Sequence, residues 1–181
     1  MNKLQLFLFL LLSASLVVSA QDTPKKFGYV GVDDCGMCHK TDKQGKQLDI
    51  WKNSKHSKAY ETLKTEQADK IAKDLGFETP AVQTPKCLKC HASGYDTEPA
   101  LLGKKFKVED GVQCETCHGP GSEYKAMKIM KSREESVKNG LIIHDQLEKF
   151  CVNCHNAESP TYIAIDVNEA WNKIKHPVPT K

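Results

Sequence analysis

Cys114-Glu-Thr-Cys-His118 is one of four stretches in this chain where two cysteines stand three positions apart and a histidine follows the second. The others are Cys35-Gly-Met-Cys-His39, Cys87-Leu-Lys-Cys-His91 and Cys151-Val-Asn-Cys-His155, and together the four use all eight cysteines of the 181 residues. Thiols at this spacing can form thioethers with the two vinyl groups of a haem, while the adjacent histidine reaches the iron. The sequence therefore predicts four covalently attached haem c groups.

Each motif supplies two attaching cysteines and one proximal iron ligand. The predicted attachment residues are Cys35, Cys38, Cys87, Cys90, Cys114, Cys117, Cys151 and Cys154, and the predicted proximal ligands are His39, His91, His118 and His155. Pairs of this kind can also bind structural zinc, and a single pair can be a redox dithiol. Neither alternative explains a histidine directly after every pair in a chain with only seven histidines. Haem attachment is the chemistry that requires it.

Three histidines lie outside the motifs: His56, His144 and His176. Four irons have eight axial positions, and seven histidines fill at most seven of them. We expect each of the three to be a distal ligand, which is a common role of neutral imidazole. Met127 and Met130 have a spacing typical of helix packing rather than ligation. One axial position is therefore expected to be open or filled by a neighbouring subunit.

The N-terminal segment has the pattern of a secretory signal. A basic start at Lys3 precedes an apolar run that ends at Val18, and small residues follow it. The run is short for a membrane span, which needs about 20 residues. We expect residues 1–20 to be cleaved and residues 21–181 to form one tetrahaem domain in the periplasm. No later segment of the sequence is apolar enough to be expected to span a membrane.

The charge balance excludes some functions. The formal net charge is +3, with 25 lysines and a single arginine, Arg133. Because surfaces that read nucleic acid rely on arginine, we do not expect nucleic acid as a partner. Charged residues make up 27% of the chain, which leaves little for an ordinary core. Four haems would provide large apolar discs around which the polypeptide can fold.

Secondary structure is expected to be mainly α-helical and irregular. Three segments have the apolar spacing of helices with a capping or terminating residue nearby: 57–75 before Gly76, 123–139 between Ser122 and Gly140, and a helix that Asp166 caps and that ends at His176-Pro177. Residues 92–111 contain Gly, Pro and Asp and predict a loop. Strand patterns are few, so little β structure is expected.

The motifs and their surroundings form four longer patterns. These are Cys35-x-x-Cys-His-Lys with Trp51-x-x-Ser-x-His56-x-x-Ala59, Cys87-x-x-Cys-His-x-x-Gly94-Tyr95, Gly111-Val-x-Cys-Glu-x-Cys-His-Gly-Pro-Gly121, and Cys151-x-x-Cys-His. In these patterns the chain resembles the tetrahaem cytochrome c-554 family of ammonia-oxidising bacteria. The likeness covers most of residues 21–181. The third pattern is the most specific.

The resemblance implies a mainly α-helical fold with closely stacked haem pairs. It also implies ligand histidines after the first, third and fourth motifs, which is the order of His56, His144 and His176. In the family the second haem lacks a distal histidine, so the haem of His91 would be the open one. For His56, which follows His39 by 17 positions, we expect a neighbouring haem rather than the first, and specifically that of His118.

An electron carrier, rather than an enzyme, is the function that the resemblance implies, with donor and acceptor redox proteins as its partners. Two alternatives stay open. The open haem could reduce a small molecule such as nitric oxide, or the chain could be a homo-oligomeric extracellular filament in which the next copy supplies the eighth ligand. The reductase alternative rests on ligand counting and analogy.

Overall fold

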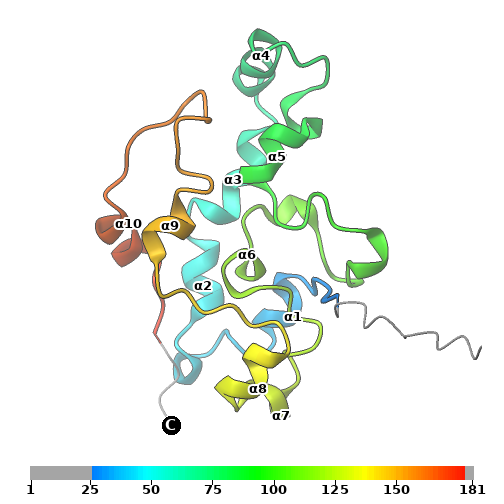
Figure 1. Cartoon of the computed structure of the whole chain (residues 1–181), viewed down its shortest axis with the longest axis vertical. Coiled ribbons are helices and arrows are strands. Elements are labelled where there is room, and N and C mark those ends of the chain that lie inside the picture. Colours follow the sequence, from blue (N-terminus) through cyan, green and yellow to red (C-terminus); the bar gives the residue numbers. More distant parts are fainter. Residues whose placement is uncertain (1–25, 178–181) are drawn as a thin grey trace, which may run out of the picture.

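The computed structural model describes residues 26–177, and in this range the chain is a series of short helices joined by loops (Figure 1). The α-helices are α1 (Val32–Gly36), α2 (Gln47–Lys52), α3 (Ala59–Thr62), α4 (Glu66–Asp74), α5 (Pro85–His91), α6 (Cys114–His118), α7 (Met127–Met130), α8 (Arg133–Lys138), α9 (Leu147–Cys151) and α10 (Val167–Ile174). Short 3-10 helices are η1 (Asp42–Gln44), η2 (His56–Lys58), η3 (Ala81–Gln83), η4 (Pro99–Leu101) and η5 (Val108–Asp110). The expected signal at residues 1–20 lies outside the described residues.

Figure 1 shows the helices as an elongated arrangement with α6 near its middle. The lobe of α3, α4 and α5 stands at one end, α7 and α8 lie at the other, and α9 and α10 lie beside one another at one side. Strand pairing in the described range is limited to an isolated parallel bridge between Tyr29 and Leu102. The expectation of a mainly α-helical, irregular chain with little β structure is confirmed.

The helix expected over residues 57–75 is present in three pieces, so its continuity was predicted wrongly. The break falls at Thr65, whose backbone is extended and whose side chain accepts a hydrogen bond from the N–H of Ala68. This is the geometry of an N-cap, which begins a new helix instead of continuing the old one. The predicted stop is confirmed, because α4 ends at Asp74 and Gly76 has a left-handed φ of 83°.

The helix expected over residues 123–139 is also divided, into α7 and α8. Ser132 lies between them and caps α8 by accepting a hydrogen bond from the N–H of Glu135. Ser122 caps neither helix; its hydroxyl accepts a hydrogen bond from the N–H of Gly28 instead, at 3.0 Å. Serine is a favourable N-cap residue at both positions. The contact with Gly28 occupies the hydroxyl of Ser122, so only Ser132 acts as a cap. Gly140 terminates this region with a φ of 105°, as expected.

The third expected helix is confirmed. The Asp166 side chain accepts a hydrogen bond from the N–H of Glu169 at 2.9 Å and so caps α10, which ends at Ile174. Residues 92–111 are loop apart from η4 and η5, as their composition predicts. No helix of the described range has the length and apolarity that a membrane span needs.

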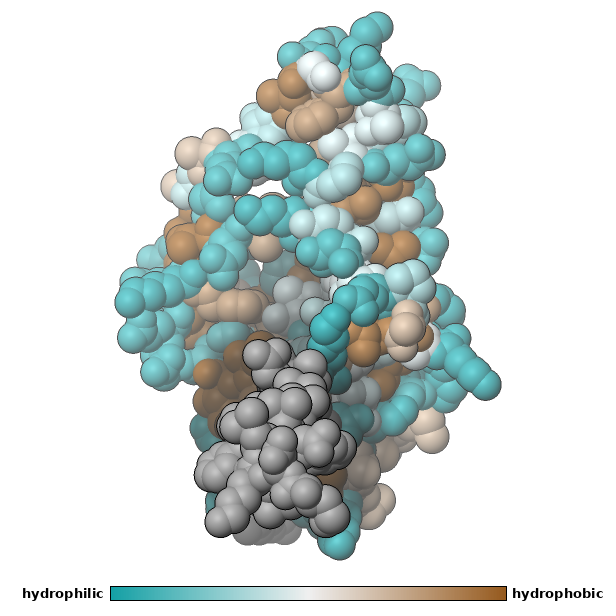
Figure 2. Space-filling view, turned by 45° about the vertical axis from the view of Figure 1, so that its right-hand side comes forward, coloured by the Kyte–Doolittle hydropathy of each residue, from teal (hydrophilic) through white to brown (hydrophobic). Residues whose placement is uncertain are grey.

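Few apolar side chains are buried in the described range. The buried ones are Val30, Val32, Leu63, Ala72, Ala81, Ala92 and Tyr124, while large apolar side chains such as Ile163, at 81% exposure, remain open. On the face in Figure 2, apolar residues appear in patches set among polar ones. With so few buried apolar side chains, most of the chain does not close a core of its own, so the attachment motifs become the centres of its organisation.

Candidate functional site: four haem-attachment motifs

Each motif is built on about one turn of helix. The second and third motifs lie in α5 and α6, while the first and fourth begin in α1 and α9 and continue into the following turn. His39 N–H donates to the carbonyl of Cys35 at 3.2 Å, and His155 N–H donates to that of Cys151 at 3.0 Å. Helical positions i, i+3 and i+4 share one face. Both thiols and the imidazole of a motif can therefore reach the same haem.

The sulfurs of different motifs meet one another. All eight cysteines are free thiols, so no disulfide competes with haem attachment. Cys35 of the first motif hydrogen-bonds Cys114 of the third, and Cys154 of the fourth hydrogen-bonds Cys90 of the second. Between the third and fourth motifs, Cys117 lies close enough to Cys151 for the two to influence each other electrostatically. Burial, and then proximity to Cys151, raise the pKa of Cys117 to about 11.

The segment that carries His56 is fixed against the residues that directly precede the third motif. Trp51 Nε1 donates to the carbonyl of Val112 at 2.8 Å, and the Val112 N–H donates to the carbonyl of His56 at 3.0 Å. Gly111 makes this contact possible, because a Cβ there would lie only 2.8 Å from the His56 oxygen and its φ is 71°. Trp51, His56 and Gly111 in the sequence patterns therefore belong to one structural joint.

The ring of His56 lies opposite that of His155, with 6.2 Å between the ring centroids. Metal–nitrogen bonds of about 2 Å place two imidazoles on opposite sides of one ion with centres about 6 Å apart. The pair therefore fits two axial ligands of the fourth haem. The expectation that His56 faces His118 is wrong: its segment is fixed beside the third motif, but its ring lies against that of His155.

His118 and His176 form a second facing pair, with ring centroids 5.7 Å apart. Burial, followed by the nearby rings of His176, His144 and His39, lowers the pKa of His118 to about 4. Burial and His155 likewise lower the pKa of His56. Both rings are thus neutral at pH 7, which is the form of imidazole that binds a metal.

His91 is held through its Nδ1 atom, which lies 2.8 Å from the carbonyl oxygen of Ala59 and 3.1 Å from the hydroxyl of Thr62. Histidines that bind metals commonly donate one ring N–H to a carbonyl, which directs the other nitrogen to the metal. His91 is therefore oriented as a proximal ligand. It takes part in neither of the two histidine pairs, and the role of its haem as the open one stays a prediction.

His144 is not brought opposite a motif histidine. Its Nε2 lies 2.6 Å from the carbonyl oxygen of Cys117, and its ring packs 3.9 Å from that of Phe150. Its role as a ligand stays a prediction. The pKa of His39, the remaining proximal candidate, is lowered mainly by burial, and the nearby side chain of Gln47 opposes this shift. Gln47 and Thr62 could not be identified from the sequence, because neither belongs to a recognisable motif.

The surroundings of the motifs suit an apolar disc. Met37 within the first motif is 64% exposed, and Val152 within the fourth is 47% exposed. Ile142 and Ile143, which follow the third motif, are also exposed. Covering such side chains with an apolar surface is favourable. The geometry of the motifs, the facing histidines and these apolar flanks together fit covalently held haem.

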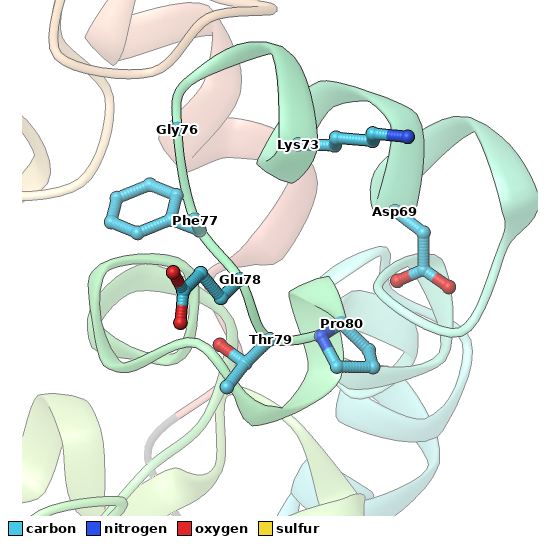
Figure 3. A pocket seen from close by; sticks show the side chains of 7 residues that line it. All are labelled: Asp69, Lys73, Gly76, Phe77, Glu78, Thr79 and Pro80. Atoms are coloured by element: carbon cyan, nitrogen blue, oxygen red, sulfur yellow. The ribbon is translucent and has the colours of Figure 1, made fainter.

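A surface hollow of about 580 Å³ lies away from the motifs, at the end of the lobe (Figure 3). It is lined by Asp69, Lys73, Gly76, Phe77, Glu78, Thr79 and Pro80, none of which belongs to a motif. Asp69 already accepts a hydrogen bond from the N–H of Ala81 at 2.8 Å, which closes the turn before η3. The carboxylate of Asp69 therefore serves the local fold.

Comparison with known proteins gives three consistent matches. Residues 34–119 match the family described as cytochrome c554 and c-prime. The curated cytochrome c-554 of Nitrosomonas europaea is 30% identical over 154 residues, which cover 77% of this chain and 62% of that protein. The solved structure of reduced cytochrome c554 from the same organism has a TM-score of 0.52 and 25% identity, over 81% of this chain and 79% of that one.

These likenesses bear on two of the expectations. The helical fold class is confirmed by the similarity to the solved structure. Four covalently attached haems are confirmed as well, because the eight cysteines fall in four attachment motifs and the matched family is tetrahaem. The chain spans about three fifths of the length of the curated relative it matches.

Proposed function

Because residues 34–119 match the cytochrome c554 family, we propose that this chain is a periplasmic electron carrier that relays electrons between respiratory redox proteins. Each haem supplies an iron that can gain and lose one electron. The protein supplies the spacing, ligation and surroundings of the four groups.

The observation that carries the proposal is the proximity of cysteines from different motifs. Cys35 meets Cys114, Cys117 lies close enough to Cys151 for the two to influence each other electrostatically, and Cys154 meets Cys90. The attachment points thus form one continuous row in the order first, third, fourth and second motif. An electron carrier needs its redox groups in such a row, whereas four independent sites would not require it.

The facing histidines support an assignment of distal ligands. We propose that His56 completes the fourth haem opposite His155 and that His176 completes the third opposite His118. His39 and His91 take part in neither facing pair. Because the family resemblance leaves the second haem open, we propose His144 for the first haem. Histidine on both sides of an iron favours a low reduction potential, because a methionine ligand raises it.

Export is part of the proposal. Residues 1–20 are proposed as a cleaved signal, and residues 21–181 as a single tetrahaem domain. Thioether attachment of c-type haem takes place outside the cytoplasm, which agrees with export. Redox proteins that dock on the exposed, lysine-rich surface are the proposed partners.

Production with its own leader in a host that attaches c-type haem tests this function. Intact mass spectrometry should give residues 21–181 plus four haems, and a spectroscopic potentiometric titration should show four reversible one-electron steps. Bound zinc without haem, or haems that cannot be cycled between oxidation states, would contradict the proposal.

A second candidate is a reductase or sensor that binds a small ligand at the haem of His91. The observation in its favour is that His91 stands outside both histidine pairs, with only its Nδ1 engaged. Electron paramagnetic resonance of the monomer should then show one high-spin haem that nitric oxide converts. Four low-spin haems that become partly high-spin on dilution would instead support the filament, with the ligand supplied by a second copy.

A further inference from the structure

We propose that Glu115 is a positioning residue that holds the first and third attachment motifs in their relative place and, through its buried charge, lowers the reduction potentials of their two haems. The inference rests on the proposed function, because it concerns haems that Cys35 and Cys114 attach. Glu115 stands between the two cysteines of the third motif, in α6, and only 2% of it is exposed. It attaches nothing itself, so its burial requires a different explanation.

The carboxylate of Glu115 gathers backbone N–H groups from two distant segments. Its Oε1 accepts hydrogen bonds from Val30 at 2.8 Å and from Gly121 at 2.7 Å, and its Oε2 accepts one from Gly31 at 2.8 Å. Hydrogen bonds to a carboxylate are stronger than those between neutral groups. Glu115 thereby ties the segment before α1 to the turn that follows α6.

The first of these segments controls the first motif. Gly31 is the N-cap of α1, and α1 carries Cys35. The thiol of Cys35 in turn hydrogen-bonds Cys114, the residue directly before Glu115. Glu115 therefore anchors the helix of the first motif at the place where its sulfur meets a sulfur of the third. Moving this anchor would displace one attachment point relative to the other.

Glutamine could not replace the carboxylate, although its shape is almost the same. Oε1 faces the N–H groups of Val30 and Gly121, and Oε2 faces the N–H of Gly31. An amide carries two donors on one end. In either orientation the NH2 group of the glutamine would face a backbone N–H, and that buried N–H would lose its hydrogen-bond acceptor. The position thus requires acceptors at both ends of the side chain.

The charge of Glu115 acts in surroundings from which water is excluded. No ion pair of the described residues involves it. Burial raises the pKa of Glu115, while the hydrogen bonds from the N–H groups of Gly121, Gly31 and Val30 favour its charged form. A negative charge favours the oxidised haem, which carries one more positive charge than the reduced haem. The effect is large where the effective dielectric constant is low. Glu115 therefore lowers the reduction potentials of the haems nearest to it.

The variant Glu115→Gln tests the proposal in the haem-loaded protein, with Glu148→Gln as its matched control. Glu148 is exposed and lies in α9, three residues before Cys151, so its replacement removes the same charge near a motif without breaking a buried contact. In Glu115→Gln we expect two of the four reduction potentials to rise and the resonance lines of two haems to change. The control should leave all four close to the parent. Potentials and resonance lines like those of the parent in Glu115→Gln would overturn the proposal.

Gly121→Ala provides a second route if Glu115→Gln does not mature. A Cβ at residue 121 would lie 3.1 Å from Oε1 of Glu115, so it displaces the carboxylate while every motif residue and the charge remain. We expect four haems and altered resonance lines for two of them; lines identical to the parent would overturn the positioning role. A parent protein with fewer than four haems contradicts the proposed function instead, so the two failures are distinguishable.

Discussion

Residues 59–91 and residues 141–177 each carry an attachment helix, but they hold it by different means. In the first region, α5 packs on an apolar cluster formed by Leu63, Ala72 and Ala81 together with partly buried neighbours such as Phe77 and Leu88. In the second region no residue is buried, and Ile163 is 81% exposed. One motif therefore rests on a small conventional core, and the other lies on a segment that has none.

This difference assigns different roles to the two haems. The second haem is added to a lobe whose side chains already stabilise one another. The fourth haem lies in a segment tied to the remaining chain by contacts at its edges, such as the ion pair of Glu158 with Lys86 at 2.8 Å. Exposed ion pairs contribute little, so apolar contact with haem is expected to order residues 141–177.

The largest expected effect is loss of the fourth haem. In Cys151→Ser/Cys154→Ser, residues 141–177 should become open to protease, with cleavage at least about tenfold faster than in the parent, because a segment without buried contacts opens at almost no cost in free energy. Limited proteolysis with mass spectrometry measures this.

Cys87→Ser/Cys90→Ser is the matched control for the second motif. It should leave residues 59–91 resistant to cleavage, since Leu63 and its neighbours remain in place. Equal susceptibility of the two regions in the two variants would show that the apolar cluster does not distinguish them.

Replacement of His56 should break the link between the two regions. His56 begins η2 at the border of the lobe, and its ring faces His155 in the second region. In His56→Ala we expect one low-spin haem, that of His155, to become high-spin in the electron paramagnetic resonance spectrum. Lys55→Ala, at the neighbouring exposed position, should change nothing. A parent-like spectrum for His56→Ala would remove His56 from the ligand set.

The sequence predicts the attachment residues well because their chemistry is local. Two thiols and a histidine within one helical turn suffice to identify a site, and the structure places each set on one turn. The cap at Asp166 and the stop at Gly76 are local in the same sense and were predicted correctly. Thr65 and Ser132 are also local caps, but their positions inside apolar patterns concealed them.

What the sequence could not predict depends on contacts between distant segments. The partner of His56 is the ring of His155, which comes from a distant segment and which spacing along the chain does not encode. The burial of Glu115 likewise follows from Val30 and Gly121, one of them 85 positions away. Such joints are visible only when the chain is folded.

The apolar cluster of the lobe gives a third, smaller effect. Leu63 is 6% exposed, and Leu63→Ala should reduce the free energy of unfolding by about 2–4 kcal/mol, because it deletes buried methyl groups. Leu75→Ala, at a side chain 53% exposed, is the control and should stay within about 0.5 kcal/mol of the parent. Denaturant titration with the four haems retained measures both. Equal losses would mean that the lobe has no core of its own.

The smallest expected effect concerns a third way of holding a motif, by charge. Asp34, directly before Cys35, pairs with Lys105 at 2.8 Å and with Lys125, and its side chain is 16% exposed. The hydrogen bond from Lys105, and then that from Lys125, lower the pKa of Asp34. A carboxyl whose folded pKa lies below its unfolded value, about 3.9, adds stability above that value and loses it as the pH falls through the folded pKa.

Asp34→Asn should therefore cost no more than about 1 kcal/mol at pH 7, and the difference from the parent should shrink below about pH 4. Asp33→Asn, whose carboxylate lies 3.4 Å from Lys107 at an exposed site, should have a smaller effect. A loss in Asp34→Asn that is the same at pH 3 and pH 7 would show that residue 34 acts through shape, and that the first motif, like the second, is held by packing.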